Sequence, residues 1–325
     1  MLNSSLPGSE GRASLSEAYN GARKGFIVDV NCGVLLLTGK EALSFVSRMS
    51  TNDLSVLNNQ GACCATVLIT EKAKIIDIVT IISTANGYLT LTSPGNAGAV
   101  KSWLERFIIM DDVQIEDRAS EYRILMLHGS GMFEKFNLPS DLSPHSARIT
   151  DKQIAFRDQL WPSAAVVMLK AGAEPAYEEA VPGLVETIRI EEGIPAFGKE
   201  ITADVNPLEA GLGQFVSGSK GCYVGQEVLA RLTTYKKVQK VLTGFIFADT
   251  DKRYLSHGEV FLSGRNVGTT TSHTWSPGLN TCIALGYLST LVSENALEFK
   301  NDLLPVAVPI HATQLPFKRI FLNTL

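Results

Sequence analysis

The residues of this chain with the clearest chemical potential lie in one octapeptide, at positions 220–227. It carries Cys222 between Lys220 and Tyr223, has glycines at 221 and 225, and ends in a Gln-Glu pair. A nearby ammonium favours the thiolate, which is the nucleophilic and redox-active form of cysteine, and glycines at this spacing let the backbone take positive φ or approach a ligand closely. A buried structural cysteine in a tight turn is the alternative, but the polar surroundings favour a functional thiol.

A second stretch with chemical potential lies at the end of a helix predicted at residues 182–192. A carboxylate held there, such as Glu191, suits the planar pair of N–H donors on an amino-pterin ring. The alternative is a surface ion pair of Arg189 with Glu191 or Glu192, which stabilises little and is common. From the chemistry of these residues alone, the ion pair is the favoured interpretation.

The octapeptide resembles the K-G-C-[FY]-x-G-Q-E run of the YgfZ-type folate-binding proteins, and every defined position matches. These proteins are relatives of the glycine cleavage T-protein (aminomethyltransferase) and are implicated in iron–sulfur cluster assembly or repair. Three further stretches are similar to T-protein blocks: R-x-E-x-G, G-x-[DE] and P-x-E within residues 186–209, G-x-[DE]-A with T-N-D within 37–53, and the barrel block within 267–287. The resemblance therefore spans most of the chain.

The resemblance implies a set of site residues. Glu191 corresponds to the carboxylate that grips the pterin ring of tetrahydrofolate. Lys220 falls where T-proteins carry arginines near the folate tail, so it is expected to pair with the glutamate carboxylate of folate and to tune Cys222, the functional thiol. The cofactor, tetrahydrofolate or a one-carbon derivative, is expected to be bound also by Arg189, Asn52, Asp53, Tyr223, Gly225, Gln226 and Glu227. The implied partners are folate and iron–sulfur proteins or their assembly machinery, with a link to tRNA modification.

One departure from the T-protein pattern bears on the reaction. T-proteins typically carry an aspartate pair after a glycine in the third strand region, and one aspartate lies close to the reacting folate nitrogens. Here Ala73 replaces the glycine, and Asp77 is followed by Ile78 at the chemically important place. Asp77 is therefore either a catalytic group or an exposed residue on an alternating strand.

These observations favour an accessory factor that binds tetrahydrofolate and supports iron–sulfur proteins, with Cys222 as its thiol. A folate-dependent aminomethyltransferase is the second interpretation, since the T-protein blocks extend over most of the chain. A non-catalytic folate sensor is the third, and an inert, buried Cys222 beside an intact folate cleft would indicate it.

Composition is that of an ordinary globular protein: 325 residues, 45% hydrophobic and 19% charged. A net charge of −4 predicts neither direct nucleic-acid binding nor membrane binding. The five cysteines include no CxxC pair or Cys/His cluster, so no metal site is expected and a reducing compartment fits best. The N-terminus lacks the features of a secretory signal or transit peptide, and no stretch is long enough for a transmembrane helix, which predicts a cytoplasmic protein.

The elements that must position these residues indicate an α+β fold. Apolar residues at helical spacing predict helices at 40–49, 96–110 and 182–192 among short strands. After residue 239, short β-type runs between turns predict a small antiparallel barrel or sandwich. The expected fold is a T-protein-like multi-domain folate-binding core with a C-terminal antiparallel β-barrel. Residues 1–20 are expected to form a loose N-terminus, 21–237 the folate-binding region with two α+β subdomains, and 238–325 the barrel domain.

Overall fold

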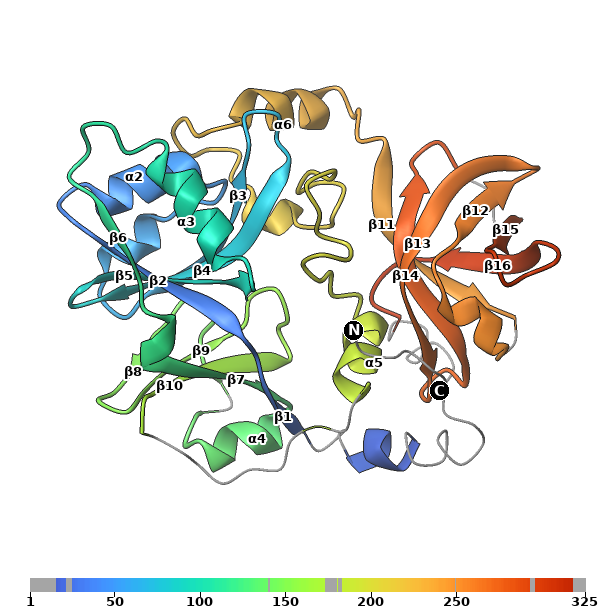
Figure 1. Ribbon diagram of the computed structural model, residues 1–325, viewed down its shortest axis with the longest axis horizontal. Coiled ribbons are helices and arrows are strands. Elements are labelled where there is room, and N and C mark those ends of the chain that lie inside the picture. Colours follow the sequence, from blue (N-terminus) through green and yellow to red (C-terminus); the bar gives the residue numbers. More distant parts are fainter. Residues whose placement is uncertain are drawn as a thin grey trace.

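The computed structural model describes residues 16–21, 25–139, 141–172, 180, 183–248, 250–292 and 296–317. They form two lobes, and helix α5 (Leu184–Glu191) and an irregular segment lie between them (Figure 1). One lobe contains two five-stranded sheets, and the other is a closed six-stranded barrel. This arrangement confirms the predicted α+β class and the predicted C-terminal antiparallel barrel.

The first sheet has the strand order β3-β4-β5-β2-β6 and carries two helices on one face. Helix α2 (Ala42–Met49) buries residues at i, i+3, i+4 and i+7, which share one side of a helix. Helix α3 (Ala97–Glu105) buries Val100, Trp103 and Leu104 in the same core. The strands of this sheet are β2 (Cys32–Thr38), β3 (Cys63–Ile69), β4 (Ile75–Thr84), β5 (Gly87–Pro94) and β6 (Gln114–Asp117).

The second sheet has the order β1-β7-β10-β9-β8 and packs face to face against the first. Alternation along the strands sends one set of side chains, including Phe156 and Met168, into the space between the sheets. The other set packs beneath helix α4 (Ser130–Lys135). The strands are β1 (Phe26–Asp29), β7 (Tyr122–His128), β8 (Ala147–Ile149), β9 (Gln153–Arg157) and β10 (Ala164–Lys170).

Helix α5 (Leu184–Glu191) lies between the two lobes (Figure 1). Leu184 and Ile188 pack towards the second sheet, whereas Ile190 packs against the barrel. The chain then runs through an irregular segment to helix α6 (Gln226–Thr234), whose Leu229 packs on the face of β3 and β4 opposite α2. Both faces of the first sheet are therefore covered, because its strands β3 and β4 are apolar on both sides.

The barrel closes in the order β11-β14-β13-β12-β15-β16, and all its pairings are antiparallel. Its interior is filled by apolar side chains such as Phe245, Phe247 and Phe299. Gly244 on the outside leaves room for Phe317, because a Cβ there would lie 2.7 Å from the ring. The strands are β11 (Lys240–Phe247), β12 (Glu259–Leu262), β13 (Arg265–Ser276), β14 (Thr281–Ser289), β15 (Leu297–Lys300) and β16 (Val308–Thr313).

Several expectations need correction. Strands β8, β9 and β15 and helices α4 and α6 were not predicted. Residues 16–20, expected to be loose, are helical, and Tyr19 is buried; residues 1–15 lie outside the described residues. No helix in the described ranges combines the length and the hydropathy needed to cross a membrane.

Candidate functional site

Cys222 lies on a loop at residues 216–225, between the short 3-10 helix at Gly213–Phe215 and α6. All five cysteines fall in the described part of the chain, and Cys222 alone is exposed. Burial raises the pKa of Cys32 and Cys63 to about 12 and that of Cys64 to about 11. These three thiols therefore stay protonated near neutral pH. Because Cys222 is also the exposed one, it is the thiol that a reagent or partner can reach.

Lys220 is bound differently from the sequence-based expectation. Its Nζ donates to the carbonyl oxygens of Ser47 at 2.8 Å, Ser50 at 2.9 Å and Asn52 at 2.5 Å. An ammonium has three N–H groups, and all three are used. Burial lowers the pKa of Lys220 to about 8, so the group remains mainly charged at pH 7. A pairing with the folate tail, which stays a prediction, would require Lys220 to give up at least one of these three bonds.

The remaining octapeptide residues shape the backbone of the loop. Tyr223 is buried in the core between the first sheet, α6 and the barrel. Gly225 has a φ of 78°, and a Cβ at this position would lie 2.5 Å from the carbonyl oxygen of Thr70, so only glycine fits. Gln226 and Glu227 form the first turn of α6 rather than part of a turn-prone loop.

Asn52 and Asp53 lie beside this loop. The side-chain nitrogen of Asn52 donates to the backbone carbonyl oxygen of Ala65 at 2.8 Å. The backbone carbonyl oxygen of Asn52 accepts a hydrogen bond from Lys220 Nζ. Asp53 is exposed and accepts from the backbone N–H of Ser55, which holds the pKa of that carboxyl below its usual range. Both residues therefore lie next to the octapeptide, just after the end of α2. The side chain of Asn52 is hydrogen-bonded to Ala65 of β3.

Arg189 and Glu191 belong to a second assembly, where α5 meets the barrel. Arg189 uses all five of its N–H groups: two bond Glu186, and the others bond Glu200, the carbonyl of Ile194 and the hydroxyl of Ser272. Partial burial would raise the pKa of Glu186, but Arg189 and Lys199 hold it at about 2. The ion pair expected with Glu191 or Glu192 was therefore wrong, because Arg189 pairs with Glu186 and Glu200. The role of Arg189 in cofactor binding stays a prediction.

Glu191 has no exposed surface. Its Oε2 accepts from the hydroxyl of Tyr19 at 2.7 Å, and its Oε1 accepts from the hydroxyl of Ser276 at 2.5 Å. The backbone carbonyl of the same residue accepts from the N–H of Phe317 at 3.0 Å. Hydroxyl groups of the protein thus donate to both carboxylate oxygens, and the contact with a pterin ring stays a prediction.

The adjacent Glu192 was missed as a site residue, although it follows Glu191 directly. Its Oε2 accepts from Trp161 Nε1 at 2.6 Å and from the hydroxyl of Ser163 at 2.5 Å, and its Oε1 lies 3.2 Å from His128 Nε2. Three segments distant in sequence supply this cluster: β7, the loop before β10 and the end of α5. No local spacing in the chain could therefore have revealed it. It ties the end of α5 to the second sheet.

Asp77 is fully buried, which corrects the expectation of an exposed strand residue. Its Oδ2 accepts from the backbone N–H of Ser93 at 3.0 Å, and its Oδ1 is buried without a hydrogen-bond partner among the described residues. Burial raises the pKa of Asp77 to about 6. The side chain holds the turn before α3, whereas Ile78 packs in the core between β4 and α6.

A pocket of about 790 Å³ opens between the β3–β4 turn and the irregular segment after α5. Ile75, Ile76, Phe197 and Ile201 supply apolar walls, and Lys72 lies at the rim. A volume of this size suits a small-molecule ligand with a planar apolar body. No local motif marks this pocket, because strand, turn and loop residues more than a hundred positions apart form its walls.

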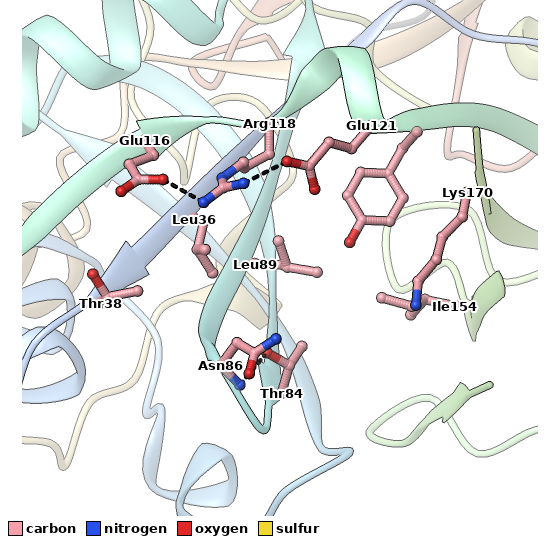
Figure 2. Close-up of a pocket in the computed structure, with 11 residues that line it drawn as sticks. Leu36, Thr38, Thr84, Asn86, Leu89, Glu116, Arg118, Glu121, Ile154 and Lys170 are labelled. Atoms are coloured by element: carbon pink, nitrogen blue, oxygen red, sulfur yellow. Dashed lines mark hydrogen bonds and ion pairs between the residues drawn. The ribbon is translucent and has the colours of Figure 1, made fainter. Parts of the chain in front are cut away.

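A separate pocket of about 390 Å³ lies at the edge of the space between the two sheets (Figure 2). Arg118 bridges Glu116 and Glu121 at its mouth, with both contacts at 2.5 Å. Lys170 projects into the opposite side. The predicted site residues do not line this pocket, and its arginine is already neutralised by two carboxylates.

The chain is similar over most of its length to known proteins. An aminomethyltransferase of a Geobacillus species is 25% identical over 94% of this chain and 90% of its own length. A protein of Arabidopsis thaliana whose name describes a chloroplastic transferase is 27% identical over 89% of this chain and 72% of its own length. The crystal structure of the glycine cleavage system aminomethyltransferase T from Bartonella henselae has the same fold, with a TM-score of 0.78 at 19% identity over 93% of this chain and 89% of that one.

Two family models match the two lobes. The GCVT N-terminal domain matches residues 13–132, and the glycine cleavage T-protein C-terminal barrel domain matches residues 240–318. Together they cover more than half of the chain, in the order in which the two-sheet lobe and the barrel occur. The fold, the two domains and the relatives agree, and the chain belongs to the glycine cleavage T-protein superfamily.

Proposed function

We propose that this protein is a tetrahydrofolate-binding accessory factor of the YgfZ type, which supports iron–sulfur cluster assembly or repair through the thiol of Cys222. One observation carries the proposal: Cys222 is exposed on a loop held at both ends, whereas Cys63, Cys64 and Cys282 are buried and Cys32 is partly buried. Membership of the T-protein superfamily supports folate binding. The match of the octapeptide to the YgfZ-type motif supports the role of the thiol.

The residues of the chain fit folate in part. Glu191 accepts two donors, as an amino-pterin ring would require, but Tyr19 must leave Oε2 before another donor can take its place. Lys220 can pair with the folate tail only by giving up at least one of its three bonds. The pocket lined by Ile75, Ile76 and Phe197 offers apolar walls for a planar ring, with Lys72 at the rim for a carboxylate.

The thiol cannot hold a cluster alone, since iron–sulfur clusters are ligated by several cysteines. Within the described ranges, no three His, Cys, Asp or Glu side chains gather where they could bind a metal ion. Cluster ligation by Cys222 would therefore need ligands from a partner protein or a small thiol. An exposed cysteine on a fixed loop is suited to such a shared or transient contact.

A folate-dependent aminomethyltransferase is the second candidate, and the names of the Geobacillus and Bartonella relatives favour it. Two side chains weigh against it in this chain. Asp77 is buried and bonded to the turn at Ser93, and Ile78 is an apolar core residue. Formation of methylene-tetrahydrofolate from an aminomethyl donor by the purified protein would establish this second function.

Complementation tests the proposal. The gene is deleted in its host, and the activity of an iron–sulfur enzyme is measured under oxidative stress with wild type, Cys222→Ala or Cys32→Ala restored. We expect wild type and the control Cys32→Ala to rescue the enzyme and Cys222→Ala to fail, with each protein present at equal abundance. Equal rescue by Cys222→Ala would remove the thiol from the function, and an unaffected enzyme in the deletion strain would refute the accessory role.

A further inference from the structure

We propose that Lys220 positions the Cys222 thiol by clamping its loop to the carboxyl end of helix α2, and that it acts neither as an anion-binding group nor by charging the sulfur. The inference rests on the proposed function only in taking Cys222 as the functional thiol. Its evidence is the hydrogen bonding of the loop itself.

The clamp joins two parts of the chain about 170 residues apart. The last carbonyls of a helix have no partner within the helix, and a cation is favourable at this negative end of the helix dipole. Helix α2 ends at Met49, and Ser50 takes an extended conformation that does not close the helix on itself. Lys220 Nζ supplies the missing donors to Ser47 and Ser50, and it also bonds the carbonyl of Asn52.

A second anchor lies on the other side of the thiol. The N–H of Val224 donates to the carbonyl of Arg48 at 3.0 Å, again at the end of α2. Tyr223 is buried, and its ring centroid lies 5.4 Å from Lys220 Nζ, within the range of a cation–π contact. Gly221 and Cys222 remain exposed between the two anchors. The loop therefore presents the thiol from a fixed base.

The start of the loop is held in the same way. The N–H of Ser217 donates to the carbonyl of Thr51 at 2.9 Å, and the hydroxyl of Ser217 accepts from the N–H of Lys220 at 3.2 Å. No hydrogen bond joins the side chains of Lys220 and Cys222 in the described part of the chain. The ammonium donates to backbone carbonyls instead, and for this reason we assign Lys220 a role in positioning the loop that carries Cys222.

A lysine suits this task better than an arginine. Three carbonyl oxygens from positions 47, 50 and 52 converge on one nitrogen, which matches the tetrahedral donors of an ammonium. A guanidinium is planar, and its five N–H groups point outward in a rigid fork. Lys220→Arg keeps the positive charge but cannot reproduce this geometry. The Lys220→Arg variant therefore distinguishes an effect of the positive charge of Lys220 on the thiol from an effect of its hydrogen bonds on the position of the loop.

The test compares Lys220→Met and Lys220→Arg with wild type and with Lys101→Met, a partly exposed surface lysine of α3. Hydrogen–deuterium exchange follows residues 214–226, and iodoacetamide alkylation of Cys222 is measured between pH 6 and 10. The three bonds of Lys220 Nζ come from a charged donor, and both variants disturb them. We therefore expect about tenfold or greater acceleration of exchange in both Lys220 variants. The midpoint of the alkylation profile is expected to stay within about 0.3 pH unit of wild type.

Two results would overturn the proposal. Unchanged exchange in Lys220→Met, with the melting temperature preserved, would show that the loop does not depend on the clamp. A displaced alkylation midpoint in Lys220→Met that Lys220→Arg restores would show that charge, not position, is the contribution of the lysine. If Lys220→Met does not fold, Lys220→Arg decides: wild-type exchange in that folded variant refutes the clamp.

These readouts do not depend on the cellular role of the thiol. If Cys222→Ala fully supports iron–sulfur enzymes while the Lys220 variants loosen the loop, the proposed function fails and the clamp stands. If Cys222→Ala abolishes support while loop exchange is unchanged in Lys220→Met, the function stands and the clamp fails.

Discussion

The junction of α5 with the barrel and the loop that carries Cys222 contain the same kinds of residue but use them in opposite ways. At the junction, Arg189 and Glu191 are buried, and protein groups occupy all five guanidinium N–H groups and both carboxylate oxygens. In the loop, Lys220 is also fully bonded, but its bonds leave a neighbouring side chain exposed. Charged groups close the first region, whereas in the second they hold a reactive group open.

The largest effect is expected at the junction. Arg189→Met leaves Glu200, which has no exposed surface, without its charged partner. Breaking a buried ion pair by removing one partner should lower the free energy of unfolding by about 3–5 kcal/mol, measured by urea denaturation. Arg118→Met, which removes two exposed ion pairs, is the control and should change stability little. A loss at Arg189 as small as the control would show that the junction is not closed by this arginine.

Asp77 is a buried carboxylate that differs from Glu191, because only one of its two oxygens, Oδ2, accepts a hydrogen bond among the described residues. Its pKa is raised from 3.8 to about 6, so the folded state binds more protons than the unfolded state between these pH values, and its contribution to stability grows as pH falls through 6. Wild type should therefore gain about 2–3 kcal/mol over Asp77→Asn in the free energy of unfolding between pH 7 and pH 4. Chemical denaturation at a series of pH values measures this difference. A difference independent of pH would mean that Asp77 titrates normally and is not desolvated.

Glu191 and Tyr19 decide whether the junction can open to a ligand. If tetrahydrofolate replaces Tyr19 on the carboxylate, Glu191→Gln should weaken its binding by roughly 1.5–3 kcal/mol. Tyr19→Phe removes the competing donor and should strengthen binding by about 0.5–1.5 kcal/mol. Calorimetric titration with tetrahydrofolate measures both, with Tyr235→Phe on the surface as the control. Weaker binding by Tyr19→Phe would identify the tyrosine as part of the ligand site instead of a competitor.

The smallest effect is expected at the far end of the octapeptide. Glu227 pairs with Arg231 across one turn of α6, and both side chains are largely exposed. Glu227→Gln should change stability by less than about 0.5 kcal/mol and leave tetrahydrofolate affinity unchanged. Thermal denaturation and the same calorimetric titration check this. A clear loss of affinity would return Glu227 to the set of ligand-binding residues and extend the functional surface along the helix.

The sequence predicted the parts of this structure that depend on local periodicity. Helix α2 repeats its apolar residues at helical spacing, and most barrel strands lie between turns, so these were predicted close to their observed bounds. The exceptions are β13, which continues five residues past its predicted end, and β15, which was not predicted. Helix α6 was missed because its nine residues include one buried side chain, Leu229, too few for a periodic signal. The bonding state of the site residues was not predictable, because Tyr19 and Ser276 reach Glu191 across 172 and 85 positions.

The closed junction has a consequence for how the protein is made. During synthesis, Glu191 and Arg189 leave the ribosome before the strand that carries Ser272 and Ser276. At about 5–20 residues per second, the 85 positions between Glu191 and Ser276 take roughly 4–17 s to translate. For that interval Arg189 lacks its bond to Ser272 and Glu191 lacks the donor from Ser276, whereas their partners outside the barrel are already made. The packing of α5 on the second sheet can thus form first, and its contacts with the barrel are completed only after translation has passed the end of β13.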